Sequence, residues 1–287
     1  MLKGSFKITH EEYHKDPCDF PSLSRGTILD LLFRSPLHAW ANHPKLNPLF
    51  QKEENGKFDI GQAAHAWFLE GVNKIFIIEA DDWRTKEAKN KRDEARINNQ
   101  IPLLEKQADQ VRNMVDIAKN RLNHSELSGL FDKRDAELTY IWNEGPTWCR
   151  AMVDMISKDR KFILDYKTTG VSANPEDFIR VILSHGYDVQ ESFYRRGVKN
   201  IEGTDPKFIF MVQENEPPYQ CSFVGLSPEF QNLGESKVVR GLDLWRTCIL
   251  TGEWPGYPKQ VCWVDPPPWA LGWEMKANFI GNKLEDI

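Results

Sequence analysis

The stretch MVDMISKDRKFILDYKTT, residues 152–169, predicts two β-strands joined by a short turn. Its two halves are rich in apolar and β-branched residues, whereas the polar SKDR between them is typical of a turn. If Ser157–Arg160 form a four-residue turn, Asp165 lies diagonal to Asp154 on one face of the strand pair. Such neighbours are about 7–8 Å apart at the backbone, close enough for two carboxylates to share one divalent ion. Lys167 lies on the same face as Asp165, because side chains alternate along a strand.

Two acids and a lysine on one face are the groups that metal-dependent phosphodiester hydrolysis needs. Carboxylate oxygens suit Mg²⁺ or Mn²⁺, which polarises the phosphoryl oxygen and lowers the pKa of an attacking water. A lysine beside the cation can orient or deprotonate that water and offset the charge that develops on phosphorus. An ordinary salt-bridge cluster on the surface of a sheet fits Asp154, Asp165 and Lys167 equally well. The strand pattern by itself leaves both interpretations open.

The segments on either side of this stretch indicate an α/β fold. The runs ELTYIW (137–142), WCRAMVDMI (148–156) and KFILDY (161–166) are separated by turn sequences and predict a three-stranded antiparallel meander. Downstream, the patterns predict helices at 175–184, 187–201 and 228–250 and strands at 208–213 and 220–224. We therefore expect an α/β or α+β fold, with helices flanking a mixed sheet.

The first 130 residues predict a mainly helical decoration of that core. Apolar residues recur at helical spacing in 24–44, where Pro36 divides two short helices, in 59–70 and in 102–124. Residues 74–79 predict a strand. Residues 84–96 carry six basic and three acidic residues and no apolar residue larger than alanine, which suggests an exposed arm. Its candidates for contacts with a DNA backbone are Lys86, Lys89, Lys91 and Arg92, and a solvated helix face is the alternative interpretation.

Composition excludes several classes of protein. The 287 residues are 40% hydrophobic and 28% charged, which is typical of a folded chain and not of a coiled coil or a disordered one. The apolar runs are far shorter than the roughly 20 residues of a membrane span, and no leader pattern begins the chain, so we expect a cytoplasmic protein. The net charge of −5 argues against coating nucleic acid through bulk charge but allows a local basic groove.

The motifs around the central stretch resemble those of a nuclease superfamily. Asp154, the eleven-residue step to Asp165, and Asp165-Tyr-Lys167 resemble the P-D-(D/E)-x-K core of restriction-endonuclease-like nucleases. Upstream, GQAAH (61–65) resembles the G-x-x-x-H helix of the RecB-type branch. Downstream, QESFY (190–194) resembles the Q-x-x-x-Y helix of that branch. The four motifs follow one another in the order that the branch shows. This resemblance implies an α/β fold with a restriction-endonuclease-like core, in which helices flank a central mixed sheet and a helical amino-terminal decoration precedes it.

The amino-terminal segment narrows this resemblance. Ser24, Leu29, Ser35-Pro36 and the YHKDP segment at Tyr13 resemble the start of the RecE-type exodeoxyribonuclease (exonuclease eight) domain. The resemblance spans roughly residues 8–250. It implies a domain over residues 1–252, followed by a Pro- and Trp-rich tail over 253–287. The tail would cover the sheet edge or form a subunit or partner contact.

The resemblance also implies a role for each matched residue. His65, Asp154 and Asp165 would be metal ligands, the backbone carbonyl of Tyr166 would complete the site, and Lys167 would be catalytic. Ordinary packing on an amphipathic helix is the alternative for His65.

Three further residues are implied less directly. Gln190 and Tyr194 would help to hold the scissile phosphate or position the lysine, although packing one helical turn apart also explains them. Glu137, on the preceding strand, is a further candidate acid near a second metal.

The function implied is a magnesium-dependent exonuclease, with Mn²⁺ as a substitute, that degrades one strand of double-stranded DNA from its 5′ end. The 3′ single-stranded tail would pass to a RecT-like annealing protein. Such enzymes are toroidal homo-oligomers encoded by phages or prophages and work in the cytoplasm of the bacterial host. A single-strand or structure-specific nuclease, or a catalytically silent DNA-binding or assembly module, are the alternatives.

The cysteines bear on one branch of this superfamily. Relatives that hold an iron–sulfur cluster carry one early cysteine and three clustered late ones. The five cysteines of this chain include no CxxC pair, and Cys221, Cys248 and Cys262 are widely separated. We therefore expect reduced thiols and no iron–sulfur cluster.

Overall fold

The predicted meander forms the centre of the main sheet. The computed structural model describes residues 2–50, 60–130 and 132–267. Strands β4 (Arg134–Glu144), β5 (Thr147–Ser157) and β6 (Phe162–Thr169) run antiparallel in that order. β7 (Lys207–Glu214) pairs parallel to β6, β8 (Cys221–Gly225) pairs antiparallel to β7, and β1 (Gly4–Phe6) pairs with β4 at the other edge. The sheet is therefore mixed, with the order β1-β4-β5-β6-β7-β8, which confirms the expected α/β fold.

The register between β5 and β6 differs from the predicted one by two residues. Met155 pairs with Leu164 and Ile156 with Ile163, so Asp165 follows directly opposite Asp154 and not diagonal to it. The connection is the loop 158–161 in place of a turn over 157–160. Hydrogen bonds to Asp159 explain the difference, because its Oδ1 accepts from Ser157 Oγ at 2.6 Å and from the N–H of Lys161 at 3.1 Å.

The ladder between β5 and β6 contains only these two pairs, so the strands diverge where the two aspartates lie. The amino-terminal segment occupies part of the edge that β6 leaves. The N–H of Leu23 donates to the carbonyl of Trp148 at 2.7 Å, and the N–H of Arg150 donates to the carbonyl of Leu23 at 2.9 Å. On the side of β5 that faces β6, the amino-terminal segment thus pairs with one end of β5, and no backbone pairing between β5 and β6 continues at the two aspartates.

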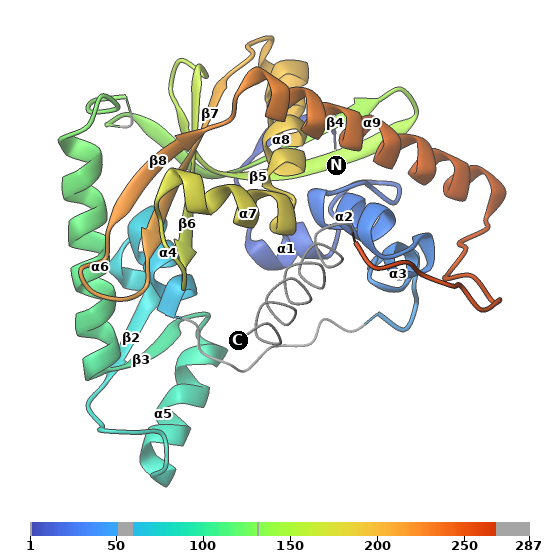
Figure 1. Cartoon of the computed structure of the whole chain (residues 1–287). Helices are drawn as coiled ribbons and strands as arrows, with labels where there is room; N and C mark the ends of the chain where they lie inside the picture. The colour runs from blue at the N-terminus through green and yellow to red at the C-terminus, as the bar shows by residue number, and fades with distance from the viewer. Residues whose placement is uncertain (1, 51–59, 131, 268–287) are drawn as a thin grey trace, which may run out of the picture. The chain divides into compact units, whose positions relative to one another are not determined.

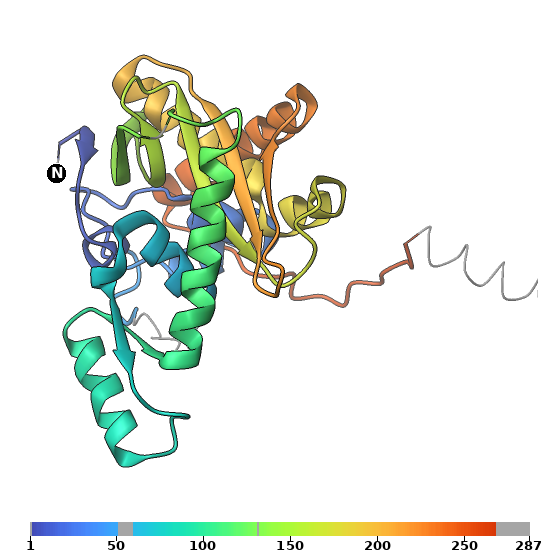
Figure 2. The ribbon, with the colours of Figure 1, turned by 90° about the vertical axis from the view of Figure 1, so that its left-hand side faces the viewer.

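Helices cover both faces of the sheet (Figure 1). One core lies between the sheet and α2 (Arg25–Phe33), α8 (Tyr187–Glu202) and α9 (Pro228–Thr251). The other lies between the sheet and α4 (Ile60–Glu70) and α6 (Glu105–Asn123), and Figure 2 shows α6 in front of the sheet. Further helices are α1 (His10–His14), α3 (Pro36–Ala41), the short 3-10 helix η1 (Val72–Lys74) and α7 (Pro175–His185).

One expectation for the amino-terminal half is wrong in detail, and of the two alternatives for residues 84–96 the structure shows a helix. The helix expected from residue 102 begins only at Glu105, because Ile101–Leu104 form strand β3, parallel to β2 (Ile75–Ile78). Leu103 is fully buried there. The expected arm is the helix α5 (Lys86–Ile97), in which Ala88 and Ala95 lie two turns apart and are buried. Its apolar stripe consists only of alanines, which is why the sequence did not show helical periodicity.

The chain divides into two compact units, Met1–Pro255 and Gly256–Ile287. In the second unit, residues 256–267 form neither helix nor strand, and Trp263 is 92% exposed. The tail predicted over 253–287 thus begins in the first unit, where Trp254 packs against Trp245 with ring centroids 5.5 Å apart. Residues 268–287 lie outside the described residues, so the role of the tail stays a prediction. Within the described part of the chain, no helix combines the length and the apolar character that crossing a membrane requires.

Candidate active site

Asp154 lies where β5 and β6 separate, and its carboxylate spans the gap. Its Oδ2 accepts a hydrogen bond from the backbone N–H of Tyr166 at 2.9 Å and lies 2.9 Å from Nε2 of His65. The side chain of Asp154 thus accepts the backbone N–H of Tyr166, which would pair with a backbone carbonyl if the ladder between β5 and β6 continued. Burial acts to raise the pKa of Asp154, but the His65 ring and Lys167 outweigh it and lower that pKa.

α4 presents His65 to this carboxylate. Gly61, Ala63 and Ala64 are buried against the sheet, and His65 follows at the side of the helix that faces the gap, with 30% of its side chain exposed. Its ring stacks near Tyr166, with centroids 6.2 Å apart. Burial acts to lower the pKa of His65, but the charge of Asp154 and its hydrogen bond raise it overall.

Asp165 is fully buried and is held by two partners. Lys167 forms an ion pair with its Oδ1, and Gln190 Nε2 on α8 donates to its Oδ2 at 2.5 Å. Burial, followed by the nearby Asp154 carboxylate, raises the pKa of Asp165 to about 6. Gln190 therefore orients a carboxylate here, and its predicted contact with a phosphate stays a prediction.

Lys167 lies on the same face as Asp165, as predicted, with 19% of its side chain exposed. Its Nζ is 5.2 Å from the ring centroid of Tyr187, which lies at the start of α8. Burial acts to lower the pKa of Lys167, but the carboxylates of Asp165 and Asp154 raise it overall. Lys167 is therefore held as a cation at the edge of the site.

Glu137 lies opposite Asp154 at an irregular point of β4. The neighbouring pairs are Ala136 with Met155 and Leu138 with Val153, and Glu137 itself has φ +52°. Val153 belongs to the core beside α8, whereas Met155 belongs to the core beside α4. A regular strand would place both on one face, so β4 and β5 exchange faces at Glu137 and Asp154.

These residues fit a divalent cation. One ligand atom each from His65, Glu137 and Asp154 lies within 4.8 Å of the others. Oε1 of Glu137 is buried and accepts no hydrogen bond within the described part of the chain. Carboxylate oxygens with one imidazole nitrogen suit Mg²⁺ or Mn²⁺, and a cation would offset the repulsion that raises the pKa of Asp165. The backbone carbonyl of Tyr166 stays a prediction as a ligand.

The structure does not bring every predicted residue to this site. Tyr194 packs its ring against Phe208, with centroids 6.2 Å apart, and burial, with the charges of Asp165 and Asp154 among smaller causes, raises the pKa of its hydroxyl, so its predicted role at the site stays a prediction. α5 lies at the far end of the β2–β3 pair, away from the main sheet, in both views (Figures 1 and 2). On α5, Lys86 and Lys89 are exposed, whereas Lys91 pairs with Glu87 and Arg92 with Asp93.

Two residues near the site were missed by the sequence analysis. His10, the first residue of α1, has its Nε2 3.0 Å from Oε2 of Glu137. Tyr187 lies between two cations, because Arg25 is 5.5 Å and Lys167 is 5.2 Å from its ring centroid. The Thr9–Glu12 capping box indicates in the sequence that a helix starts at His10, but nothing in the sequence shows that this helix lies near the motif residues.

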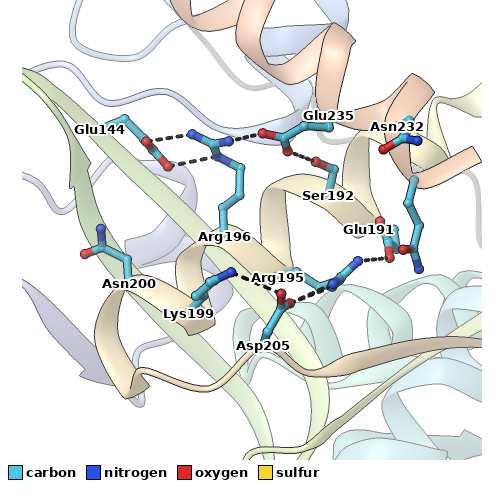
Figure 3. Close-up of a pocket in the computed structure, with 11 residues that line it drawn as sticks. Glu144, Glu191, Ser192, Arg195, Arg196, Lys199, Asn200, Asp205, Asn232 and Glu235 are labelled. Carbon is cyan, nitrogen blue, oxygen red and sulfur yellow. Dashed lines mark hydrogen bonds and ion pairs between the residues drawn. The ribbon is translucent and has the colours of Figure 1, made fainter. Parts of the chain in front are cut away.

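A charged cleft of about 510 Å³ is lined on one side by α8, including Glu191 and Ser192, and contains none of the residues predicted to hold a metal or act in catalysis. Its three basic residues, Arg195, Arg196 and Lys199 of α8, all have acidic partners (Figure 3). Arg196 joins Glu144 at the end of β4 to Glu235 of α9. The ion pairs therefore hold α8 between β4 and α9, and they leave none of these three cations unpaired for an anion.

Comparison with known proteins agrees with this geometry. A family described as a PDDEXK-like domain of unknown function (DUF3799) matches residues 27–264. The chain belongs to this family. The PDDEXK-like chain is also similar in fold to a crystal structure from Eubacterium rectale described as a "putative exonuclease", with a TM-score of 0.60 and 10% identity over 93% of this chain and 98% of that one. No curated protein matches the sequence. The family and the fold support a nuclease of the P-D-(D/E)-x-K superfamily.

Proposed function

We propose that this protein is a divalent-metal-dependent exodeoxyribonuclease that acts on the ends of double-stranded DNA and removes nucleotides in the 5′ to 3′ direction. The observation that carries the proposal is the convergence of two aspartates, a lysine and a histidine from three elements, with α8 holding one aspartate through Gln190. These are the acid, base and ligand groups that phosphodiester hydrolysis requires.

His65, Asp154 and Asp165 would hold the cation, with Glu137 as a further carboxylate ligand. The cation, with Mg²⁺ as the physiological ion and Mn²⁺ as its substitute, would supply Lewis-acid polarisation of the scissile phosphate. Lys167 would orient the attacking water and offset the negative charge that develops on the phosphoryl oxygens. Gln190 keeps the Asp165 carboxylate in place, which fixes the position of Lys167 through their ion pair.

The resemblance to RecE-type enzymes supports the finer parts of the proposal. The 3′ tails would serve a RecT-like annealing protein in phage-type recombination, in the cytoplasm of a bacterial host. The active form would be a toroidal homo-oligomer that encircles the duplex. An enzyme that encircles its substrate needs less positive surface than one that binds it from one side, and a net charge of −5 is consistent with that.

Digestion of one DNA sequence as a linear duplex, as a covalently closed circle and as single strands tests the proposal. With Mg²⁺ and the linear duplex, we expect a label at the 5′ end to be released before a label at the 3′ end. Covalently closed circular DNA of the same sequence should stay intact. Calcium should bind without supporting turnover, because it is larger and activates water poorly. Cleavage of the closed circle or of single strands alone would favour the structure-specific alternative, and full activity in excess chelator would overturn the metal-dependent assignment.

A further inference from the structure

We propose that α1 supplies His10 as a ligand for a second divalent cation, which His10 would hold together with Glu137 beside a first position at which His65 and Asp154 offer ligand atoms. The inference rests on the proposed function and adds a residue that lies outside all four motifs. It starts from a contact: Nε2 of His10 is 3.0 Å from Oε2 of Glu137.

The distance between the two atoms fits neighbouring ligands of one ion. Two ligands about 2.1 Å from a cation and at a right angle to one another lie about 3 Å apart. The same separation, 2.9 Å, joins His65 Nε2 to Asp154 Oδ2 at the first position. Each position therefore pairs one imidazole nitrogen with one carboxylate oxygen.

The second carboxylate oxygen of Glu137, Oε1, is also available to bind a cation. Oε1 is buried and lacks a hydrogen-bond partner among the described residues, which is costly for a carboxylate unless a cation or a donor satisfies it. The residue also has φ +52° in a strand, a conformation that non-glycine residues rarely adopt. This conformation lies where β4 and β5 exchange faces, and it places the carboxylate among His10, His65 and Asp154.

The sequence of the amino-terminal segment fixes His10 at this place. β1 pairs antiparallel with β4, with Phe6 opposite Thr139, so the chain leaving β1 runs toward Glu137. Thr9 then begins α1 with a capping box. Its Oγ1 accepts from the N–H of Glu12 at 3.1 Å, and its own N–H donates to Glu12 Oε2 at 2.7 Å. His10 is therefore the first helical residue, and its side chain is 56% exposed, so a cation can reach it.

The donor set predicts which ions the second position prefers. Imidazole nitrogen favours Mn²⁺ and later transition metals over Mg²⁺ and Ca²⁺, which prefer oxygen ligands. We therefore expect Mn²⁺ to occupy both positions and Mg²⁺ to occupy the second one more weakly. Removal of His10 should abolish that difference between the two ions at the second position.

Binding of Mn²⁺ to the metal-free full chain, measured by calorimetry and by electron paramagnetic resonance, tests the inference without DNA. Wild-type protein should bind two Mn²⁺ per chain. His10→Ala should weaken one of the two sites by about tenfold or more and leave the other unchanged, whereas Glu137→Gln removes a carboxylate that faces both positions and should weaken both. His124→Ala removes an exposed histidine whose Nδ1 lies 2.9 Å from the carbonyl of Asn120 on its own helix, and it should still bind two ions. Thermal melting would verify that each variant is folded.

The outcomes separate this inference from the proposed function. One Mn²⁺ per chain in the wild type, or two ions whose affinities His10→Ala leaves unchanged, would overturn the second position. Cleavage of linear DNA by that same preparation would then leave the proposed function standing. Conversely, two His10-dependent ions in a protein that cleaves no DNA would keep the site and remove the function.

Discussion

The two central aspartates occupy opposite positions on neighbouring strands, yet their surroundings differ. Asp154 is contacted by an imidazole and a backbone N–H, which favour its charged form, whereas Asp165 is fully buried and its pKa is raised to about 6. The difference arises because β6 leaves β5 at this point and α8 covers only Asp165. The two aspartates therefore differ in pKa, which is lowered for Asp154 and raised for Asp165.

Lys167 should be required for cleavage and dispensable for binding of the metal. We expect Lys167→Ala to lower the cleavage rate by about 100-fold or more, because the variant loses the cation that acts on the water and the developing charge. Asp165→Ala should lose metal affinity as well as activity. Rates on saturating linear DNA and Mn²⁺ titrations distinguish the two variants.

Lys161→Ala is the matched control for Lys167→Ala, since this lysine lies just before the same strand with its side chain 68% exposed. It should keep the wild-type rate. A Lys167→Ala enzyme that retained a rate near that of the wild type, with an unchanged melting temperature, would show that the site is assigned to the wrong residues.

Motif spacing located Asp154, Asp165, Lys167, His65 and Gln190, because each lies in a regular element whose period can be read from the sequence. It failed where local structure departs from that period. The sequence shows neither the hydrogen bonds of Asp159 that shift the register nor the exchange of faces at Glu137. His10 was missed for a third reason: its proximity to Glu137 depends on the pairing of two segments more than 120 residues apart in the sequence.

At the scale of elements, the position of Gln190 depends on close packing of α8 against α9. Gly234 of α9 permits that approach, because a Cβ atom there would lie 2.2 Å from the backbone oxygen of Asp188. Two residues beyond Asp188, Gln190 reaches Asp165. The spacing of the two helices is therefore connected to the carboxylate of the site.

Gly234→Ala should destabilise the protein by about 2–3 kcal/mol, because a backbone atom cannot move aside as a flexible side chain can. The shift of α8 should also lower activity in the protein that remains folded. Gly26→Ala is the control, since its Cβ would meet nothing closer than Ser24 Oγ at 3.9 Å. Alanine there should be neutral or stabilise α2 by up to about 1 kcal/mol. Equal free energies of unfolding for the two variants would contradict this account.

α5 offers a second prediction at this scale, as a DNA contact outside the motifs. Lys86 and Lys89 are exposed, and each phosphate that a protein neutralises steepens the salt dependence of binding by about 0.9 in log–log slope. Replacing both with glutamine should weaken duplex binding at moderate salt and reduce the slope by about 1–2. The rate on saturating DNA should stay the same.

Lys207→Gln with Arg240→Gln makes the same change in net charge at two other exposed positions, and it should leave the slope unchanged. Titrations at several salt concentrations give both slopes. If the α5 variant and this control had the same slope as the wild type, α5 would be a solvated helix with no part in DNA recognition.

For the whole molecule, the order of strands and helices was predictable because long apolar runs and turn signals repeat along the chain. The meander β4-β5-β6 and the helices α8 and α9 follow that pattern. β1 and α1 are too short for their sequences to show a clear period, and their positions depend on the residues that they contact. β1 adds to the sheet edge, and the segment after α1 enters a buried polar cluster beside β5.

That cluster consists of Asp16, Ser22, His43 and Arg150, all buried, and it joins the amino-terminal segment to β5. Ser22 donates to Asp16 through its hydroxyl at 2.7 Å and its N–H at 2.8 Å, while His43 and Arg150 each approach Oδ2 to 3.3 Å. Burial acts to raise the pKa of Asp16, but His43, Arg150 and Ser22 outweigh it and lower that pKa from 3.8 to about 2. The charged carboxylate is therefore preferred in the folded protein.

Because the pKa of Asp16 is lower in the folded state than in the unfolded state, the charged carboxylate stabilises the folded protein. This contribution to the free energy of unfolding is present at a pH where Asp16 is charged in both the folded and the unfolded state. A shift from 3.8 to about 2 corresponds to about 2 kcal/mol. The contribution is complete well above pH 3.8 and is lost as the pH falls toward 2.

Asp16→Asn retains the shape of the side chain and tolerates the φ of +60°, but it leaves Arg150 without its charged partner.

We therefore expect Asp16→Asn to lower the free energy of unfolding by about 2 kcal/mol or more at pH 7, with a difference from the wild type that narrows below pH 4 and is roughly halved at pH 3. Denaturant unfolding at a series of pH values measures this difference. Asp243→Asn breaks an exposed pair with Arg246 and should change stability by less than about 0.5 kcal/mol at every pH. A difference for Asp16→Asn that stayed constant from pH 7 to pH 3 would mean that the carboxylate charge does not hold the amino-terminal segment on β5, and that its hydrogen-bonding shape alone does.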